Sequence, residues 1–318
     1  MNSVLRYILR RLLFIVPVLL FVSAFIFFLI RITPSDPINS ITSGRRISDD
    51  TRASLVRQYY LDRSLPEQYF IWIGNVFKGN LGDSFRYRQP VSALLSARLP
   101  TTIQLVFMSA IIAVLIAIPF GVLSAIKRGA VLDRLISGFM IFCVSSPVFL
   151  NAIILMLIFS LRLRWFPAFG AGQGFIQNLY YLFLPAFALS LNMVALIGRI
   201  TRDRMIGELK SGYALALRAK GTSFGRIVMN HCLKNTLIPV ITVGGIQLGA
   251  MLVGAVLVEN VFALGGIGAL LIEAIQGSDY PVVQSIMLLL VAIFLFLNLL
   301  VDIVYVIIDP RIRARNGQ

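Results

Sequence analysis

Residues 12–30 read LLFIVPVLLFVSAFIFFLI, a stretch without a single charged side chain. Five further uncharged stretches follow, at residues 99–126, 135–161, 165–198, 235–258 and 280–301. Each is about as long as, or longer than, the roughly 20 residues that a helix needs to cross the hydrocarbon layer. The first part of residues 165–198 contains three glycines and reads as a loop, so we place that span at residues 179–198.

These stretches predict helices, because a backbone in lipid must satisfy its N–H and C=O groups within its own segment or within a closed barrel. A barrel would show short alternating strands, and these stretches do not alternate. The composition agrees: 58% hydrophobic and 14% charged residues lie outside the range of soluble domains. The first stretch also looks like a secretory signal, but its apolar run continues through Ile30, beyond the roughly 7–15 residues of a signal core. The sequence therefore predicts an all-α integral membrane protein with six transmembrane helices.

Basic residues predict the orientation, because Lys and Arg accumulate on the cytoplasmic side. They precede the first span, join spans two and three, follow span six, and number eight within residues 199–234. The opposite short loops hold only Arg162 and Arg164. We expect both termini in the cytoplasm, with three regions. These are a cytoplasmic N-terminus and first span (1–31), an extracytoplasmic segment (32–98), and a five-helix core with a cytoplasmic loop at about 200–234 (99–318). The net charge of +15 follows from this pattern and does not indicate nucleic-acid binding.

The extracytoplasmic segment mixes polar and apolar residues at helical spacing over residues 48–77, which predicts two short amphipathic helices. It serves either as a structural cap or as a docking surface for a partner, and the sequence leaves both open. Glu259, Glu273 and Asp279 give an acidic bias to the outer loop between spans five and six. Such a bias would attract a cationic substrate or hold a binding protein, but we expect plain solvation.

Several single residues carry a functional and a structural interpretation. Asp302 shares a helical face with Asn298 and Tyr305, and we favour a structural role near the interface over a proton relay. His231, the only histidine, is too isolated to form a metal site. Cys143 and Cys232 are expected to be buried apolar fillers without a disulfide. Small residues let helix backbones approach closely, so three glycines of span five predict helix packing: Gly245, Gly249 and Gly254.

The loop between spans four and five has an organisation of its own. Residues 209–220 are rich in helix formers and end at Gly221, a natural helix stop. A second amphipathic segment follows, and Pro239 opens span five. The pattern predicts a short cytoplasmic helix, a sharp glycine turn and a helix leading back into the membrane. This element would present a rigid protruding surface to a cytosolic partner. The alternative is an ordinary basic loop that lies on the lipid headgroups.

Two runs in this loop resemble a known family: Arg218-Ala-Lys-Gly221, and His231-Cys-Leu-Lys-Asn235-Thr-Leu-Ile-Pro239. They are similar to the loop signature of permease subunits of ATP-binding-cassette (ABC) importers, closest to the dipeptide, oligopeptide and nickel branch. Further segments along nearly the whole chain agree with that branch: Arg6-Tyr-Ile-Leu-Arg-Arg11, Asp36-Pro37, Leu99-Pro-Thr-Thr102, Val258-Glu-Asn-Val-Phe262, Asp279-Tyr-Pro-Val-Val283 and Asp309-Pro-Arg-Ile-Arg313. The family's Glu-Ala-Ala motif maps to Leu215-Ala216-Leu217, so its acidic residue is missing, and Leu264-Gly265 replaces a common aromatic-proline pair.

The resemblance implies a type I importer permease fold in a bacterial or archaeal cytoplasmic membrane. It also implies that a coupling segment, residues 214–223, contacts the ATPase and transmits its motion to the spans. The residues concerned are Ala214, Leu215, Ala216, Leu217, Arg218, Ala219, Lys220, Gly221, Thr222 and Ser223. The implied partners are a second similar permease, two cytosolic ATPases and an extracytoplasmic solute-binding protein. The chain has no Gly-Lys pair and thus no phosphate-binding loop, so ATP and Mg would bind to the partner ATPases, with no cofactor on this chain.

The expected function is that of a permease subunit providing half of a path for di- or oligopeptides by alternating access. A nickel chelate or another small solute is the alternative substrate within the same family. Two other classes compete. A membrane-embedded protease would need converging intramembrane ligands or nucleophiles, which one loop histidine and one interfacial aspartate do not supply. A gated channel would be active as this chain alone.

Overall fold

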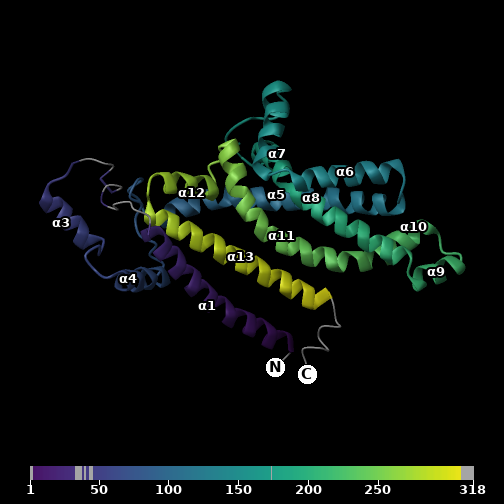
Figure 1. Ribbon diagram of the computed structural model, residues 1–318, viewed down its shortest axis with the longest axis horizontal. Coiled ribbons are helices and arrows are strands. Elements are labelled where there is room, and N and C mark those ends of the chain that lie inside the picture. Colours follow the sequence, from purple (N-terminus) through teal and green to yellow (C-terminus); the bar gives the residue numbers. More distant parts are fainter. Residues whose placement is uncertain (1–2, 33–37, 39–40, 43–45, 173, 309–318) are drawn as a thin grey trace.

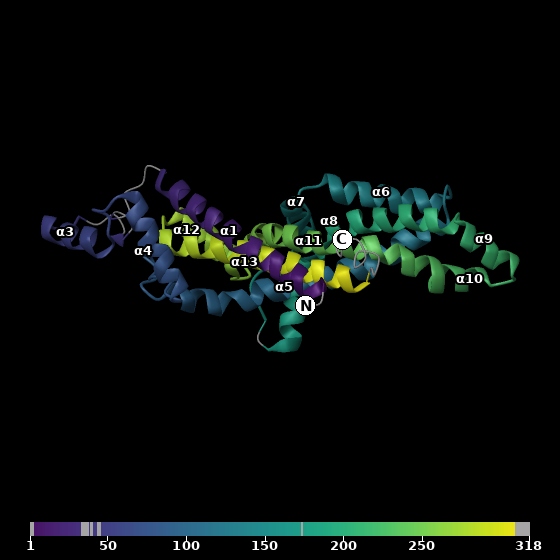
Figure 2. The same cartoon turned by 90° about the horizontal axis from the view of Figure 1, so that it is seen from below.

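The structure is a computed structural model that describes residues 3–32, 38, 41–42, 46–172 and 174–308. Its described part is helical, apart from a single isolated bridge between Asp83 and Pro90. The helices run in chain order as α1 (Ser3–Ile32), α3 (Asp49–Gln58), α4 (Leu65–Phe77), α5 (Val91–Ile126), α6 (Val131–Ser145), α7 (Val148–Leu155), the π-helix η1 (Met156–Arg162), α8 (Phe175–Leu209), α9 (Gly212–Ala219), α10 (Phe224–Arg226), the π-helix η2 (Ile227–Cys232), α11 (Leu233–Phe262), α12 (Ile267–Gln276) and α13 (Tyr280–Ile308). The molecule is elongated, with α3 near one end and α9 near the other (Figures 1 and 2).

Five helical segments are long and apolar enough to cross a membrane: Arg11–Ile32, Val91–Ile126, Phe175–Leu209, Phe224–Phe262 and Tyr280–Ile303. They contain five of the six predicted spans. The start of α1 and the end of α13 lie near each other, because these two helices run side by side (Figure 1). The predicted loop before span four is present, and α8 begins directly after Gly174, whose φ is +80°.

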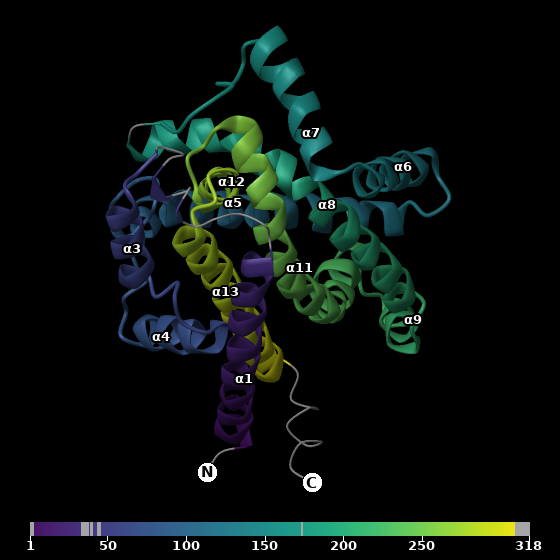
Figure 3. The same ribbon diagram turned by 60° about the vertical axis from the view of Figure 1, so that its left-hand side comes forward.

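The predicted third span, residues 135–161, is broken. It consists of α6 and a second arm, Val148–Arg162, and the two are bent by 110° relative to each other. Ser146 at the break is extended (φ −92°, ψ 129°). The cause is Pro147, which has no N–H to donate and disfavours a helical conformation in the residue before it. The second arm, formed by α7 and η1, points away from the other helices (Figure 3).

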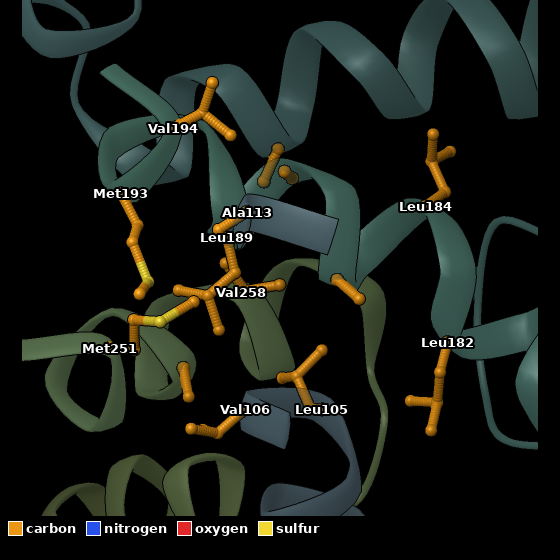
Figure 4. Close-up of a cluster of buried hydrophobic side chains, with 14 of the residues drawn as sticks. Leu105, Val106, Ala113, Leu182, Leu184, Leu189, Met193, Val194, Met251 and Val258 are labelled. Atoms are coloured by element: carbon orange, nitrogen blue, oxygen red, sulfur yellow. The ribbon is translucent and has the colours of Figure 1, made fainter. Parts of the chain in front are cut away.

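Helix α8 is the centre of the bundle. In its most apolar window 72% of the residues are buried, against 17% in the first span and 11% in the last. It packs along α5 and also contacts α6, α7 and α11. Figure 4 shows the largest buried cluster, in which side chains from α5, α8 and α11 meet; among them are Leu105, Leu189, Met193, Met251 and Val258. The core thus joins the second, fourth and fifth predicted spans.

The two predicted amphipathic helices of residues 48–77 are α3 and α4. Ser48 caps α3 by accepting a hydrogen bond from the Thr51 N–H at 3.3 Å. Helix α4 lies against α1, where the Tyr69 hydroxyl is 2.9 Å from Ser23 Oγ and the Tyr69 ring meets Phe27 edge-on. Helix α3 has no buried residue. One helix of the segment therefore supports the first span, and the other is exposed along most of its surface, with only Leu55 and Val56 half-buried.

Candidate functional site

The loop between the fourth and fifth predicted spans forms a helix, a glycine turn and a return helix. Helix α8 continues to Leu209, so the short helix α9 begins at Gly212 and not at residue 209 as the sequence suggested. Gly221 has a φ of +79°, the left-handed conformation that glycine adopts without strain. Its N–H donates to the Arg218 carbonyl at 2.9 Å, and the Thr222 N–H donates to the Leu217 carbonyl at 3.1 Å. These two bonds make a Schellman motif, which satisfies carbonyls at the end of α9 and fixes the turn.

The inner face of this loop is anchored in an apolar cluster. Ala214, Ile227 and Cys232 are fully buried there, packed with Met205 of α8 and Ala125 at the end of α5. Cys232 is a free thiol, as is Cys143 in α6. The cluster joins the loop to two membrane-spanning helices, so a displacement of α9 would be transmitted to both.

The outer face of the loop is exposed and both apolar and basic. Leu215 is 56% exposed and Phe224 43% exposed. The Arg218 guanidinium lies 5.0 Å from the centroid of the Phe224 ring, a cation–π contact across the turn. Of the ten residues of the coupling segment, one is buried (Ala214), two are half-buried (Leu217, Thr222), and the other seven are exposed. The structure therefore brings this segment together as one protruding surface.

A polar network connects α8, α9 and α11 at the base of the loop. The Tyr213 hydroxyl donates to Glu208 Oε2 at 2.5 Å. Asn235 Nδ2 donates to the same carboxylate oxygen at 3.3 Å and to the Tyr213 hydroxyl oxygen at 3.2 Å. Burial and the hydrogen bond to Glu208 raise the pKa of Tyr213 well above its ordinary value. The sequence analysis did not find this network; only the position of Asn235 within the quoted loop signature hinted at it.

A second feature missed in the sequence is an ion pair at the end of the bundle where α8 leads into α9. Arg202 of α8 donates to Asp133 of α6 through Nε at 2.8 Å and through Nη2 at 2.9 Å. Ser124 Oγ and the Gly129 N–H donate to the same carboxylate, the latter at 2.9 Å. The available signal was a lone acidic residue among the basic residues that join spans two and three. Together these contacts fix the α5–α6 loop against the helix that leads into α9.

The acidic residues at the outer loop are not simply solvated, so the expectation of plain solvation was wrong for two of the three. Glu259 and Asp279 are both 0% exposed. Glu259 accepts hydrogen bonds from Thr102 Oγ1 at 2.5 Å, from the Gly268 N–H at 2.7 Å and from the Ala269 N–H at 3.2 Å. It therefore satisfies the free N–H groups at the start of α12, where a negative charge is also favoured by the helix dipole.

Asp279 holds the segment between α4 and α5 onto the start of α13. Its carboxylate accepts from Ser84 Oγ at 2.5 Å and from the N–H groups of Phe85 and Arg86, both at 3.1 Å. Glu273 lies nearby and is partly exposed; it accepts from the Tyr87 hydroxyl at 2.5 Å. Burial, and the hydrogen bond to Glu273, raise the pKa of Tyr87. These acids thus fasten elements of the outer face together.

The three glycines of span five face different neighbours. A Cβ added at Gly245 would collide with Val301, and one added at Gly249 would collide with Phe294, so both glycines let α11 approach α13. A Cβ at Gly254 would lie 2.8 Å from Leu189 Cδ1 of α8. All of these contacts are within this chain.

The remaining single residues sit in structural settings. Arg11 Nη1 is 3.0 Å from Asp302 Oδ2, so the intramembrane aspartate of α13 has a cationic partner on α1. The side chain of Tyr305 lies outside the described residues. His231 is exposed on η2. In the described part of the chain, no three His, Cys, Asp or Glu side chains are grouped so as to hold a metal ion.

The chain thus has several helices that could cross a membrane and an exposed loop at α9 whose inner face is anchored in the bundle. Two family profiles match the chain. The one described as "Binding-protein-dependent transport system inner membrane component" matches residues 117–314, and its N-terminal counterpart, "Binding-prot-dependent transport system membrane comp, N-term", matches residues 4–106. The chain therefore belongs to the inner membrane components of binding-protein-dependent transport systems, and it is a permease of the ABC importer type.

Individual relatives agree with this family over almost their full lengths. A probable peptide ABC transporter permease of Sinorhizobium fredii is 38% identical over 310 residues, covering 96% of this chain and 99% of that protein. A di/tripeptide transport system permease of Pseudomonas aeruginosa is 36% identical, covering 97% and 99%. A dipeptide transport system permease of Escherichia coli is 33% identical, covering 98% and 99%.

A solved structure supports the fold. A chain from "Inward facing conformations of the MetNI methionine ABC transporter" aligns with a TM-score of 0.58 at 20% identity, covering 69% of this chain and 97% of that one. The expectation of an importer permease fold is thereby confirmed.

Proposed function

We propose that this chain is one of two permease subunits of an ATP-driven importer of di- or oligopeptides in a bacterial or archaeal cytoplasmic membrane. It forms half of the translocation path, and its coupling segment, residues 214–223, receives the movement of a cytosolic ATPase. ATP and Mg²⁺ bind to the ATPase subunits, and an extracytoplasmic binding protein delivers the substrate. The observation that carries the proposal is the exposed α9–Gly221 turn, which is anchored on its inner face to α5 and α8.

The surface of the coupling segment suits a protein partner. Exposed apolar side chains such as Leu215 and Phe224 gain free energy when a partner covers them, about 25 cal/mol for each Å² removed from water. Arg218 and Lys220, both exposed, add positive charge to the same surface. The Schellman motif holds this surface in one conformation, so little entropy is lost when it docks.

The network at the base of the loop supports transmission of movement. Glu208, Tyr213 and Asn235 belong to three different helices and are joined by hydrogen bonds. Because α9 is hydrogen-bonded to both α8 and α11, a displacement of α9 would be transmitted to the buried centre of the bundle and to the span that follows the loop. Alternating access needs such a connection between the ATPase and the spans.

The peptide substrate is proposed from the relatives, which are named as peptide, dipeptide and di/tripeptide permeases. A nickel chelate or another small solute remains the alternative within this family. Uptake assays with reconstituted vesicles and the co-purifying binding protein distinguish these substrates. Ion flux through vesicles that contain this chain alone would instead support a stand-alone channel.

The coupling role is tested by reversing the charges of Arg218 and Lys220 to glutamate in the complete importer, reconstituted in vesicles. A matched control reverses Lys127 and Arg128, an exposed basic pair on another loop predicted to be cytoplasmic. We expect peptide uptake to fall at least about tenfold in the first variant, equivalent to about 1.4 kcal/mol, while the control keeps its uptake. ATP hydrolysis is measured in parallel, because loss of coupling separates hydrolysis from uptake. Equal uptake in the two variants would reject the assignment.

A further inference from the structure

A cavity of about 290 Å³, with both polar and apolar walls, lies at the C-terminal end of α1, far from the coupling segment. Its walls come from the last turn of α1, from α4, from the turns that follow α3 and α4, and from the first turn of α13. The lining includes Arg31, Trp72 and Gln284, together with aromatic side chains such as Tyr59 and Phe85. Four separate parts of the chain therefore build one pocket.

Three of the lining residues contain hydrogen-bonding atoms that have no partner. These are Arg31 Nη1, Trp72 Nε1 and Gln284 Nε2, and all three atoms are buried. Each of them is a donor, and none is an acceptor. A buried N–H without an acceptor is unfavourable, and proteins rarely leave one unpaired without a reason. Three such donors on the wall of one cavity indicate a ligand that supplies acceptor oxygens.

The charge of Arg31 points in the same direction. Its Nε donates to Gln68 Oε1 at 3.1 Å, and its guanidinium carbon lies 3.6 Å from the centroid of the Phe27 ring. Both partners are uncharged, and within the described residues no carboxylate forms an ion pair with Arg31. Among the described residues, Asp83 is the single carboxylate in the cavity wall. A half-buried guanidinium without an acidic partner has one side of its fork left to bind an anion.

We propose that this cavity binds an oxyanion, with the guanidinium of Arg31 as the charged contact and the Trp72 indole and Gln284 amide as neutral donors. A water molecule would accept some of these hydrogen bonds but would leave the positive charge unbalanced. The oxyanion has two possible sources, a free small anion such as phosphate or the phosphate group of a lipid. The site is independent of the coupling role, so the failure of either proposal leaves the other intact.

The two tryptophans of the chain allow a direct test. Trp165→Phe leaves Trp72, in the cavity wall, as the only tryptophan, and Trp165 itself is 59% exposed and outside the cavity. The full chain carrying this change is purified in a phosphate-free detergent, and Trp72 fluorescence is followed during titration with sodium phosphate. Sodium chloride at equal ionic strength is the control. In a second arm, the Trp72 fluorescence of the protein in vesicles of phosphatidylglycerol is compared with its fluorescence in a phosphate-free detergent.

We expect a saturable change of Trp72 fluorescence, with apparent affinity at least about tenfold lower in Arg31→Met and reduced in Gln284→Met. Arg57→Met, an exposed arginine of α3, should bind like the parent. A response to free phosphate identifies a small-anion site, and a response to phosphatidylglycerol alone identifies a lipid phosphate. If Arg31→Met does not fold, the affinity of Gln284→Met relative to the parent decides whether the anion binds in this cavity. No saturable change in either arm, or a change that neither variant affects, would overturn the proposal.

Discussion

The ion pair between Asp133 and Arg202 yields a quantitative prediction, because its two members are buried to different extents. The Asp133 side chain is 6% exposed, whereas that of Arg202 is 24% exposed. Removing the arginine leaves a carboxylate inside the protein, while removing the negative charge leaves a guanidinium that reaches water. Arg202→Met should therefore cost more stability than Asp133→Asn, although both break the same pair.

The magnitudes follow from the contacts that remain. In Arg202→Met, Asp133 keeps the hydroxyls of Ser124 and Ser137 and the Gly129 N–H as donors, and we expect a loss of about 3 kcal/mol, the lower end for breaking a buried pair. In Asp133→Asn, the guanidinium keeps Asp203 at 3.3 Å and its solvent contact, and we expect about 2 kcal/mol. The exposed Asp203 is the matched control, and Asp203→Asn should cost no more than about 0.5 kcal/mol.

The assay is a double-mutant cycle on the purified full chain. Unfolding in mixed micelles is followed by tryptophan fluorescence for the parent, both single variants and the double variant. We expect a coupling free energy of about 1–3 kcal/mol, since the second change removes a partner that the first has already left unpaired. Additive losses would refute the reasoning, as would a larger loss for Asp133→Asn than for Arg202→Met.

Three further predictions concern single positions. Gly221→Ala forces a side chain into the left-handed conformation, so it should lower the free energy of unfolding by about 1 kcal/mol and impair uptake. Gly225 has a negative φ and equally open space around it. Gly225→Ala should therefore change neither the stability nor the uptake in the same assays. Gly249→Leu should lower the thermal unfolding midpoint by separating α11 from α13, and the midpoint of Gly138→Leu, with open space around it, should stay near that of the parent. The pKa of Tyr87 in the folded protein is raised above its ordinary value of 10.0, so the stability contributed by the neutral hydroxyl is complete below that pH and is lost as pH rises above it, through the folded pKa. Tyr87→Phe should flatten this alkaline loss of stability in a pH series of unfolding curves.

The spans could be predicted from the sequence because lipid imposes a simple rule, namely that a long uncharged stretch must be helical. The same rule does not say whether a helix is continuous. Pro147 was a visible signal, but proline also occurs inside intact spans, as Pro185 does in α8 and Pro239 in α11. Only the surrounding packing decides between a tolerated proline and the 110° break found here.

The buried carboxylates show a different limit of sequence analysis. The donors that surround Asp279 come from residues 84–86, almost two hundred positions earlier in the chain. Thr102, the partner of Glu259, is 157 positions away in sequence. No local pattern marks such a pairing, so acidic residues next to a predicted loop look solvated. The helix–glycine–helix form of the loop around α9, in contrast, is determined by neighbours within five positions, and the sequence predicted it. Its cytoplasmic location and its contact with an ATPase stay predictions.

The burial of α8 has a practical consequence for anyone who modifies this protein. At 35 residues the helix is about 52 Å long, and its inner end lies three residues before α9. The residues that hold the bundle together are therefore the same ones that would carry a push from the ATPase. A substitution that makes the middle of α8 more rigid also alters the mechanical path, so stability and turnover cannot be tuned separately there. Thermostabilising changes belong on α1 and α13, whose surfaces are mostly free of the core.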